Sequence, residues 1–217
     1  MAHTLNEQVV VIPAGTGDAN IELILDAAAS LTGWYRDGYT LYCDNAHTMG
    51  VRFNWSAGSS SCRVDGFFNG NVTLDYVSSF AVSAGTTIRA HVSADESVQY
   101  INFGNQYLKF IHAVNSNGDD LLFQPKANDA VYCGTPVIEA AQTIYMPYNT
   151  TGTTYCITKM PDIINGSDTP SLFMAVGTAS PSLNDQLVSF DGTVYRIVFL
   201  GESSNTSTLA FAFPVSA

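Results

Sequence analysis

The histidines and cysteines are the residues of this 217-residue chain that could hold a metal ion or act as nucleophiles. No two histidines have a spacing that would aim them at one metal, so isolated surface or hydrogen-bonded histidines are expected. The four are His3, His47, His91 and His112. No phosphate-binding, dinucleotide-binding, zinc-protease or serine-hydrolase motif occurs. We therefore expect no catalytic residue, no metal and no cofactor.

The four cysteines show no C-x-x-C spacing, which argues against a zinc site. Buried free thiols on strands are favoured, because the chain shows no secretory signal. Two sequential disulfides, Cys43 to Cys62 and Cys133 to Cys156, are the alternative.

Most acidic residues stand beside Gly, Asn or Ser, where Asp and Asn stabilise turns by bonding their own backbone. The segment 115–120 (Asn-Ser-Asn-Gly-Asp-Asp) imitates the start of an EF-hand calcium loop. It lacks the distal glutamate and the flanking helix, so a plain hairpin turn is expected there.

The aromatic residues are the remaining candidates for binding. Trp34, Tyr35 and Trp55 could stack on sugar rings or anchor a protein partner. Phe67 and Phe68 are adjacent, and neighbouring residues of a strand face opposite ways. We therefore predict that one of these two rings inserts into a neighbouring subunit.

The elements that must position these residues are mostly strands. The clearest stretch is 186–215, where two β-prone runs flank Asp191-Gly192 and a third run follows, which predicts a closing β-meander. Further short strands are expected at 8–12, 38–43, 49–55, 71–76, 87–92, 98–103, 107–114, 121–124, 130–133, 143–146, 153–157 and 172–176.

One helix is expected from Ala19 to about Leu31, with Asp18 as its N-cap and Gly33 at its C-terminal end. A strand at 20–25 is the alternative. The predicted fold class is all-β: an antiparallel, jelly-roll-like β-sandwich of one or two units with a short N-terminal helix. The expected units are 1–104 and 105–217, and a single domain 1–217 is the other interpretation.

Composition limits the function. Hydrophobic residues make up 46% and charged residues 12%, so the surface must be covered mainly by Ser, Thr, Asn and Gly. Only 8 basic residues stand against 19 acidic ones, which disfavours binding to nucleic acid or to an anionic membrane. No apolar run is long enough to cross a bilayer.

This combination of turn-rich short strands, one N-terminal helix, few lysines and a neutral Ser/Thr/Asn surface resembles the accessory structural proteins of tailed-phage virions. The resemblance implies a non-enzymatic virion component, such as a capsid decoration, head-fibre or tail module. Its partners would be further copies of itself and other virion structural proteins. The alternative is a carbohydrate-binding or adhesive β-sandwich, secreted or on a cell surface, that binds a host-surface glycan. A β-fold enzyme is the third interpretation.

Overall fold

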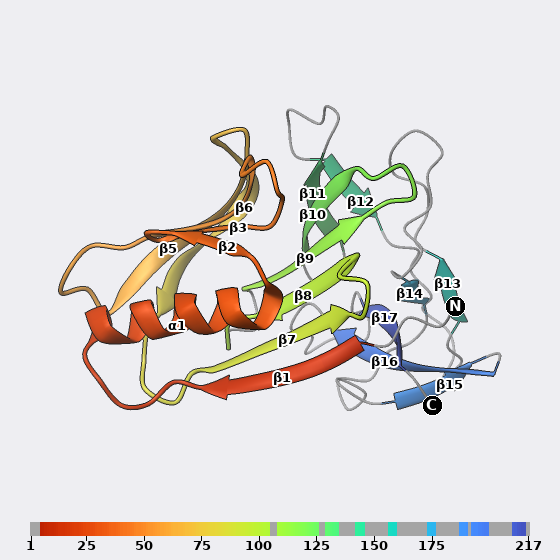
Figure 1. Ribbon diagram of the computed structural model, residues 1–217, viewed down its shortest axis with the longest axis horizontal. Helices are drawn as coiled ribbons and strands as arrows, with labels where there is room; N and C mark the ends of the chain where they lie inside the picture. Colours follow the sequence, from red (N-terminus) through yellow and green to blue (C-terminus); the bar gives the residue numbers. More distant parts are fainter. Residues whose placement is uncertain are drawn as a thin grey trace.

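The computed structural model describes residues 5–104, 108–125, 129–134, 142–145, 156–159, 173–176, 187–190, 192–199 and 210–215 (Figure 1). Within these residues the strands form three antiparallel sheets, and the only helix is α1 (Gly17–Thr32). The predicted class, a mostly β protein with antiparallel sheets and one helix, is confirmed.

Sheet A has seven strands in the order β1-β7-β8-β9-β10-β11-β12. They are β1 (Leu5–Val11), β7 (Thr87–Ser93), β8 (Val98–Asn102), β9 (Lys109–Val114), β10 (Asp120–Pro125), β11 (Asp129–Gly134) and β12 (Gln142–Tyr145). The expected boundary at residue 104 falls between β8 and β9, which pair directly from Val98 opposite Ala113. The two expected units would therefore share one sheet.

Sheet B has five strands in chain order and packs, together with α1, on one face of sheet A. Its strands are β2 (Tyr35–Asp37), β3 (Thr40–Tyr42), β4 (Met49–Asn54), β5 (Ser61–Phe68) and β6 (Asn71–Ala81). Between the sheets, the buried ring of Phe53 on β4 packs edge-on against Phe103, which follows β8, at 5.1 Å. Ile24 and Ala28 of α1 belong to the same apolar core.

Sheet C has five strands in the order β13-β14-β17-β16-β15 and reaches the opposite face of sheet A (Figure 1). Its strands are β13 (Cys156–Lys159), β14 (Phe173–Val176), β17 (Ala210–Val215), β16 (Thr193–Phe199) and β15 (Leu187–Phe190). Phe213 of β17 stacks on His91 of β7 at 6.2 Å and lies 6.0 Å from Tyr100 of β8. Sheet A is therefore the middle layer.

The predicted closing meander is confirmed by the pairing of β15 with β16 and of β16 with β17. Phe190 pairs with Thr193, so the connection is a two-residue turn, and Gly192 has a φ of 74°. A positive φ is what the favoured hairpin turns require and what glycine tolerates.

Helix α1 is present as predicted, but its N-cap is Thr16 rather than Asp18. The hydroxyl of Thr16 accepts a hydrogen bond from the amide of Ala19. Asp18 lies two residues further along, in the first turn of the helix, and its carboxylate accepts from Trp55 Nε1 at 2.9 Å and from the amide of Gly58 at 3.0 Å. Asp18 therefore fastens the start of the helix to the loop between β4 and β5.

Substitution of Thr16 tests its assignment as the N-cap of α1. Thr16→Ala removes the acceptor for the Ala19 amide, and loss of an N-cap oxygen costs about 1 kcal/mol of folding free energy. Urea unfolding followed by circular dichroism should show this loss, whereas Thr16→Ser, which keeps a hydroxyl, should stay close to the parent. Equal losses in both variants would contradict the cap.

Candidate functional site

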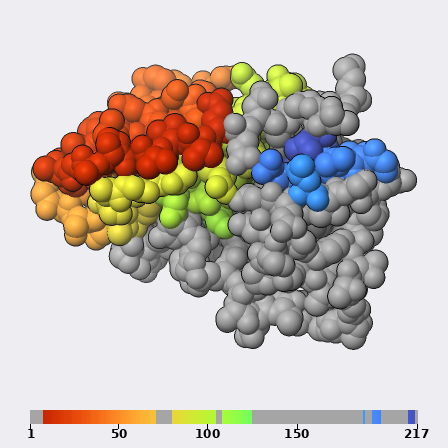
Figure 2. Space-filling view, turned by 90° about the horizontal axis from the view of Figure 1, so that it is seen from below, coloured from red at the N-terminus to blue at the C-terminus, as the bar shows by residue number. Residues whose placement is uncertain are grey.

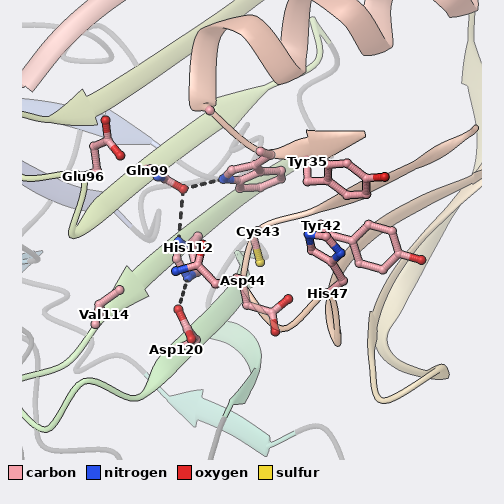
Figure 3. Close-up of a pocket in the computed structure, with 13 residues that line it drawn as sticks. Tyr35, Tyr42, Cys43, Asp44, His47, Glu96, Gln99, His112, Val114 and Asp120 are labelled. Atoms are coloured by element: carbon pink, nitrogen blue, oxygen red, sulfur yellow. Dashed lines mark hydrogen bonds and ion pairs between the residues drawn. The ribbon is translucent and has the colours of Figure 1, made fainter. Parts of the chain in front are cut away.

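A cavity of about 240 Å³ lies where the ends of sheets A and B meet. Its walls come from the segment after α1, from the loop between β3 and β4, and from β8, β9 and the first residue of β10. The lining residues are Gly33, Trp34, Tyr35, Tyr42, Cys43, Asp44, Asn45, His47, Glu96, Gln99, His112, Val114 and Asp120 (Figure 3). Most of these side chains are polar, in contrast to the apolar core beside them.

A chain of hydrogen bonds crosses the inner wall of the cavity (Figure 3). Trp34 Nε1 donates to Gln99 Oε1 at 2.5 Å, and the same oxygen lies 3.1 Å from His112 Nδ1. His112 Nε2 lies 2.8 Å from Asp120 Oδ1. Trp34, Gln99 and His112 are buried, with exposed fractions of 4%, 7% and 4%, whereas the Asp120 side chain keeps 30% of its surface open.

The partners in this series of hydrogen bonds indicate which atoms donate and which accept. An indole N–H can only donate, so the Gln99 atom that it meets must be the carbonyl oxygen. That oxygen can only accept, so His112 Nδ1 carries a proton. Nε2 of the same ring lies at the Asp120 carboxylate, so the imidazole bridges Gln99 and Asp120.

The end of α1 places Trp34. Gly33 adopts a left-handed conformation with φ 77°, and its amide donates to the carbonyl of Ala29 at 2.8 Å. The hydroxyl of Thr32 then accepts from the amide of Trp34 at 3.2 Å. This C-terminal cap turns the chain sharply, so that the indole points at sheet A rather than continuing along the helix.

The loop between β3 and β4 forms a second wall, and Asp44 organises it. The Asp44 carboxylate, which is 5% exposed, accepts from the amides of Thr48 and Met49 at 3.0 and 2.8 Å and from the Thr48 hydroxyl at 2.7 Å. His47, inside this turn, has a φ of 55°, which is uncommon outside glycine. Asp44 thus holds His47 in place by shaping the loop.

Three rings gather on one side of the cavity (Figure 3). His47 stacks on Tyr35 with ring centres 4.1 Å apart and planes 7° apart. Tyr42 lies 5.3 Å from His47. Tyr35 remains 52% exposed, so this stack is open to solvent at the rim.

Glu96 enters from the turn between β7 and β8. Asp95 Oδ1 accepts from the hydroxyls of Ser93 and Ser97, each at 2.7 Å, which closes the turn. Glu96 takes a φ of 57°, and its exposed side chain lies across the cavity from the aromatic rings (Figure 3).

The structure brings two of the predicted binding residues to this cavity and leaves the others elsewhere. Trp34 forms part of the inner wall and Tyr35 the rim. Trp55 lies outside it, bonded to Asp18 and packed against the core.

The insertion of Phe67 or Phe68 into a neighbouring subunit stays a prediction, and the burial of both rings within their own chain disfavours it. Both are buried, with exposed fractions of 5% and 3%. Phe68 joins the apolar core, and Phe67 packs edge-on against Tyr42 at 5.5 Å, with the guanidinium of Arg52 at 5.4 Å from its ring. Each ring therefore already has partners in its own chain.

The other sequence expectations concern cysteines and calcium. Cys43 and Cys62 are buried thiols that are not joined in a disulfide, which overturns the disulfide alternative for this pair. Burial raises the pKa of Cys62 to about 11, so its thiol stays protonated at neutral pH. The side chains of Cys133 and Cys156 lie outside the described part of the structure.

The 115–120 segment is a hairpin turn, as expected. The side-chain oxygen of Asn115 accepts from the amides of Asn117 and Asp119 at 3.0 and 2.8 Å, and its amide group donates to the Asp119 carboxylate. In the part of the chain that the structure describes, no group of three or more His, Cys, Asp or Glu residues is arranged to hold a metal ion. The same residues contain no helix that is long and apolar enough to span a membrane.

The residues that sequence reasoning missed are Gln99, His112 and Asp120. A usable signal existed, because Gln99 and His112 interrupt the apolar runs of two neighbouring strands at inward-facing positions. A buried polar residue is more informative than an exposed one. Their meeting with Trp34, 65 residues before Gln99, needs the folded register.

No protein-family model, curated protein or solved structure matches the chain. The fold and the cavity therefore define the class by themselves: an antiparallel β protein with a small polar pocket between two packed sheets.

Proposed function

We propose that the protein is a structural component of a virion, a capsid decoration, head-fibre or tail module, that acts by assembly with other copies of itself and with other virion proteins. The observation that carries this proposal is the edge of sheet A at β1. Among the described strands β1 pairs only with β7, so its outer edge presents backbone groups without a neighbouring strand.

The β1 edge also presents apolar side chains. Val9 and Val11 are 48% and 61% exposed, and Gln8, which precedes them, is exposed as well. Natural edge strands are usually protected by Lys, Pro or a bulge, because an open edge pairs with other strands. The run Glu7 to Val11 has none of these residues, and its pairing with β7 shows no register shift. Figure 2, seen from below, shows at the surface the red part of the chain, which begins in β1 and continues into α1.

The test is the mass of the purified protein in solution. We expect a defined oligomer by light scattering, and we expect Val9→Lys with Val11→Lys to shift it towards monomer, because charge on an edge opposes strand pairing. Tyr39→Lys, on the turn between β2 and β3, is the matched exposed control and should leave the mass unchanged. A parent that is monomeric at all concentrations, or an oligomer that survives both lysines, would contradict assembly through β1.

Detection of the chain in purified particles of the virus that encodes it tests the virion part of the proposal separately.

A second candidate function, carbohydrate binding, is favoured by one specific observation. The exposed Tyr35–His47 stack stands at the rim of a polar cavity, and sugar sites combine an aromatic surface with hydrogen-bonding side chains. Under both candidates the protein has no catalytic role, and the sandwich of sheets A and B serves as a rigid scaffold.

A further inference from the structure

We infer that the cavity between sheets A and B is a binding site for a single neutral sugar ring, held between the Tyr35–His47 stack and the His112–Asp120 pair. This inference rests on the second candidate function and specifies its site. It is independent of assembly through β1.

The burial of polar groups in the cavity wall indicates a binding site rather than a gap left by imperfect packing. Burying a polar group costs free energy unless it is hydrogen-bonded, and an apolar core would avoid that cost. Here an indole N–H, an amide, an imidazole and a carboxylate are satisfied in one continuous chain that ends at the partly open Asp120. Such a fully bonded network is rigid, so it holds Asp120 in one position towards the cavity.

The size of the cavity fits one ring. Pockets for drug-sized ligands span roughly 300–1,000 Å³. A volume of about 240 Å³ is smaller, so it suits a monosaccharide or the terminal residue of a longer glycan.

The charges of the lining favour a neutral ligand. No lysine or arginine is among the described lining residues, which disfavours phosphates, sulfates and carboxylates. The two carboxylates in the inner walls already have hydrogen-bond partners, Asp44 in the Thr48 and Met49 amides and Asp120 in His112. The third lining carboxylate, that of Glu96, is exposed, so solvent and salt screen its charge towards an organic cation.

The arrangement of polar and aromatic groups matches a sugar. Hydroxyl groups donate well to carboxylate oxygens, and Asp120 and Glu96 supply such acceptors from two sides of the cavity. Asn45, also in the lining, can both donate and accept. The rings of Tyr35, Tyr42 and His47 provide an apolar surface for the C–H face of a pyranose.

The experiment uses the full-length protein and a panel of methyl glycosides of common neutral hexoses, followed by saturation-transfer NMR and calorimetry. A single-ring site is expected to bind weakly, with a Kd of about 1 mM. Tetramethylammonium and inorganic phosphate are the cationic and anionic comparison probes. At least one glycoside should bind, and both charged probes should fail to compete with it.

Variants then locate the site. Tyr35→Ala should weaken binding at least about tenfold, since stacking area is lost at an exposed position where folding is little affected. Tyr39→Ala is the matched control, because Tyr39 is the other exposed tyrosine of the same hairpin and does not line the cavity. Asp120→Asn should weaken binding by a similar factor, with the melting temperature measured alongside.

The outcomes separate this inference from the function on which it rests. If a glycan binds and its affinity is unchanged in Tyr35→Ala and Asp120→Asn, carbohydrate binding stands and the cavity is not its site. If no neutral glycoside binds up to about 10 mM, or if a charged probe binds better, the inference is overturned. A glycan array with the same protein then decides whether carbohydrate binding itself survives.

Discussion

Lowering the pH from about 7 to about 5 will destabilise the protein through His91, and the variant His91→Phe will lose that part of the acid sensitivity. His91 is 1% exposed and lies between Tyr100 and Phe213, where sheet C covers sheet A. Burial, together with the positive charges of Arg196 and Arg89, lowers its pKa from 6.5 to about 3. In the described part of the structure its buried Nε2 makes no hydrogen bond.

Stability falls at lower pH because the unfolded state binds a proton at His91 that the folded state does not bind. Between pH 6.5 and about 3 the unfolded chain protonates His91 and the folded chain does not, so protons favour unfolding. Stability therefore falls as the pH drops below 6.5 and stops falling near 3. The loss reaches about 2 kcal/mol at pH 5 and on the order of 3–5 kcal/mol over the whole window.

Urea unfolding between about pH 7.5 and pH 5 measures this effect, because the chain stays above its pI of about 4.4 in that range. His91→Phe keeps a ring against Phe213, so the slope of stability against pH should change more than the stability at pH 7.5. Tyr100→Phe disturbs the same aromatic cluster without removing a group that titrates in acid. The slope of its stability against pH should therefore match that of the parent. A constant difference between His91→Phe and the parent at every pH would contradict the assignment.

The local elements of this fold could be predicted from the sequence because their signals are local. The Asp191-Gly192 pair between two β-prone runs predicts the hairpin of β15 and β16, and helical spacing of apolar residues predicts α1. Strand β5 was not predicted because its pairing with β6 shifts register between Cys62 and Val64 and again between Asp65 and Phe67. Such irregularities interrupt the alternation of apolar and polar residues by which a strand is recognised in a sequence.

The cavity could not be predicted in the same way. Trp34, Gln99 and His112 lie on different elements, and only the register of β8 against β9 places Gln99 opposite His112. Pairing register depends on which faces are buried, and a one-residue shift of β8 would turn Gln99 to the other face of sheet A, away from His112. The aromatic residues near position 34 were recognised as candidates, but their polar partners come from the second layer of the sandwich.

The same contacts connect stability to the candidate site. The bond from Trp34 to Gln99 joins the end of α1 to sheet A, and the ion pairs of Arg36 with Glu22 and Asp26 join β2 to α1. The cavity wall is thus built from contacts that also hold sheet B and the helix on sheet A. A substitution that moves β3 against β4 should therefore damage the fold and the cavity together.

Gly50→Ala is that substitution, and it should destabilise the protein by about 3 kcal/mol or more, or prevent folding. Gly50 on β4 pairs with Tyr42 on β3 and with Phe67 on β5, and the rings of these two residues meet edge-on at 5.5 Å. A Cβ at position 50 would lie 2.0 Å from the carbonyl oxygen of Leu41 and 2.9 Å from the Cα of Tyr42. These are backbone atoms, so no side-chain rotation relieves the clash and β3 must move away from β4.

Gly70→Ala is the matched control for the loss of a glycine. Position 70 has a φ of 78° and no heavy atom within 4 Å of an added Cβ, so it carries backbone strain alone, about 1–2 kcal/mol. Chemical unfolding of both variants separates strain from the steric clash between strands. Because Tyr42 lines the cavity, a folded Gly50→Ala protein should also lose glycoside binding, whereas Gly70→Ala should keep it. If Gly50→Ala loses no more stability than Gly70→Ala, then β3 and β4 are not packed as closely as this geometry requires.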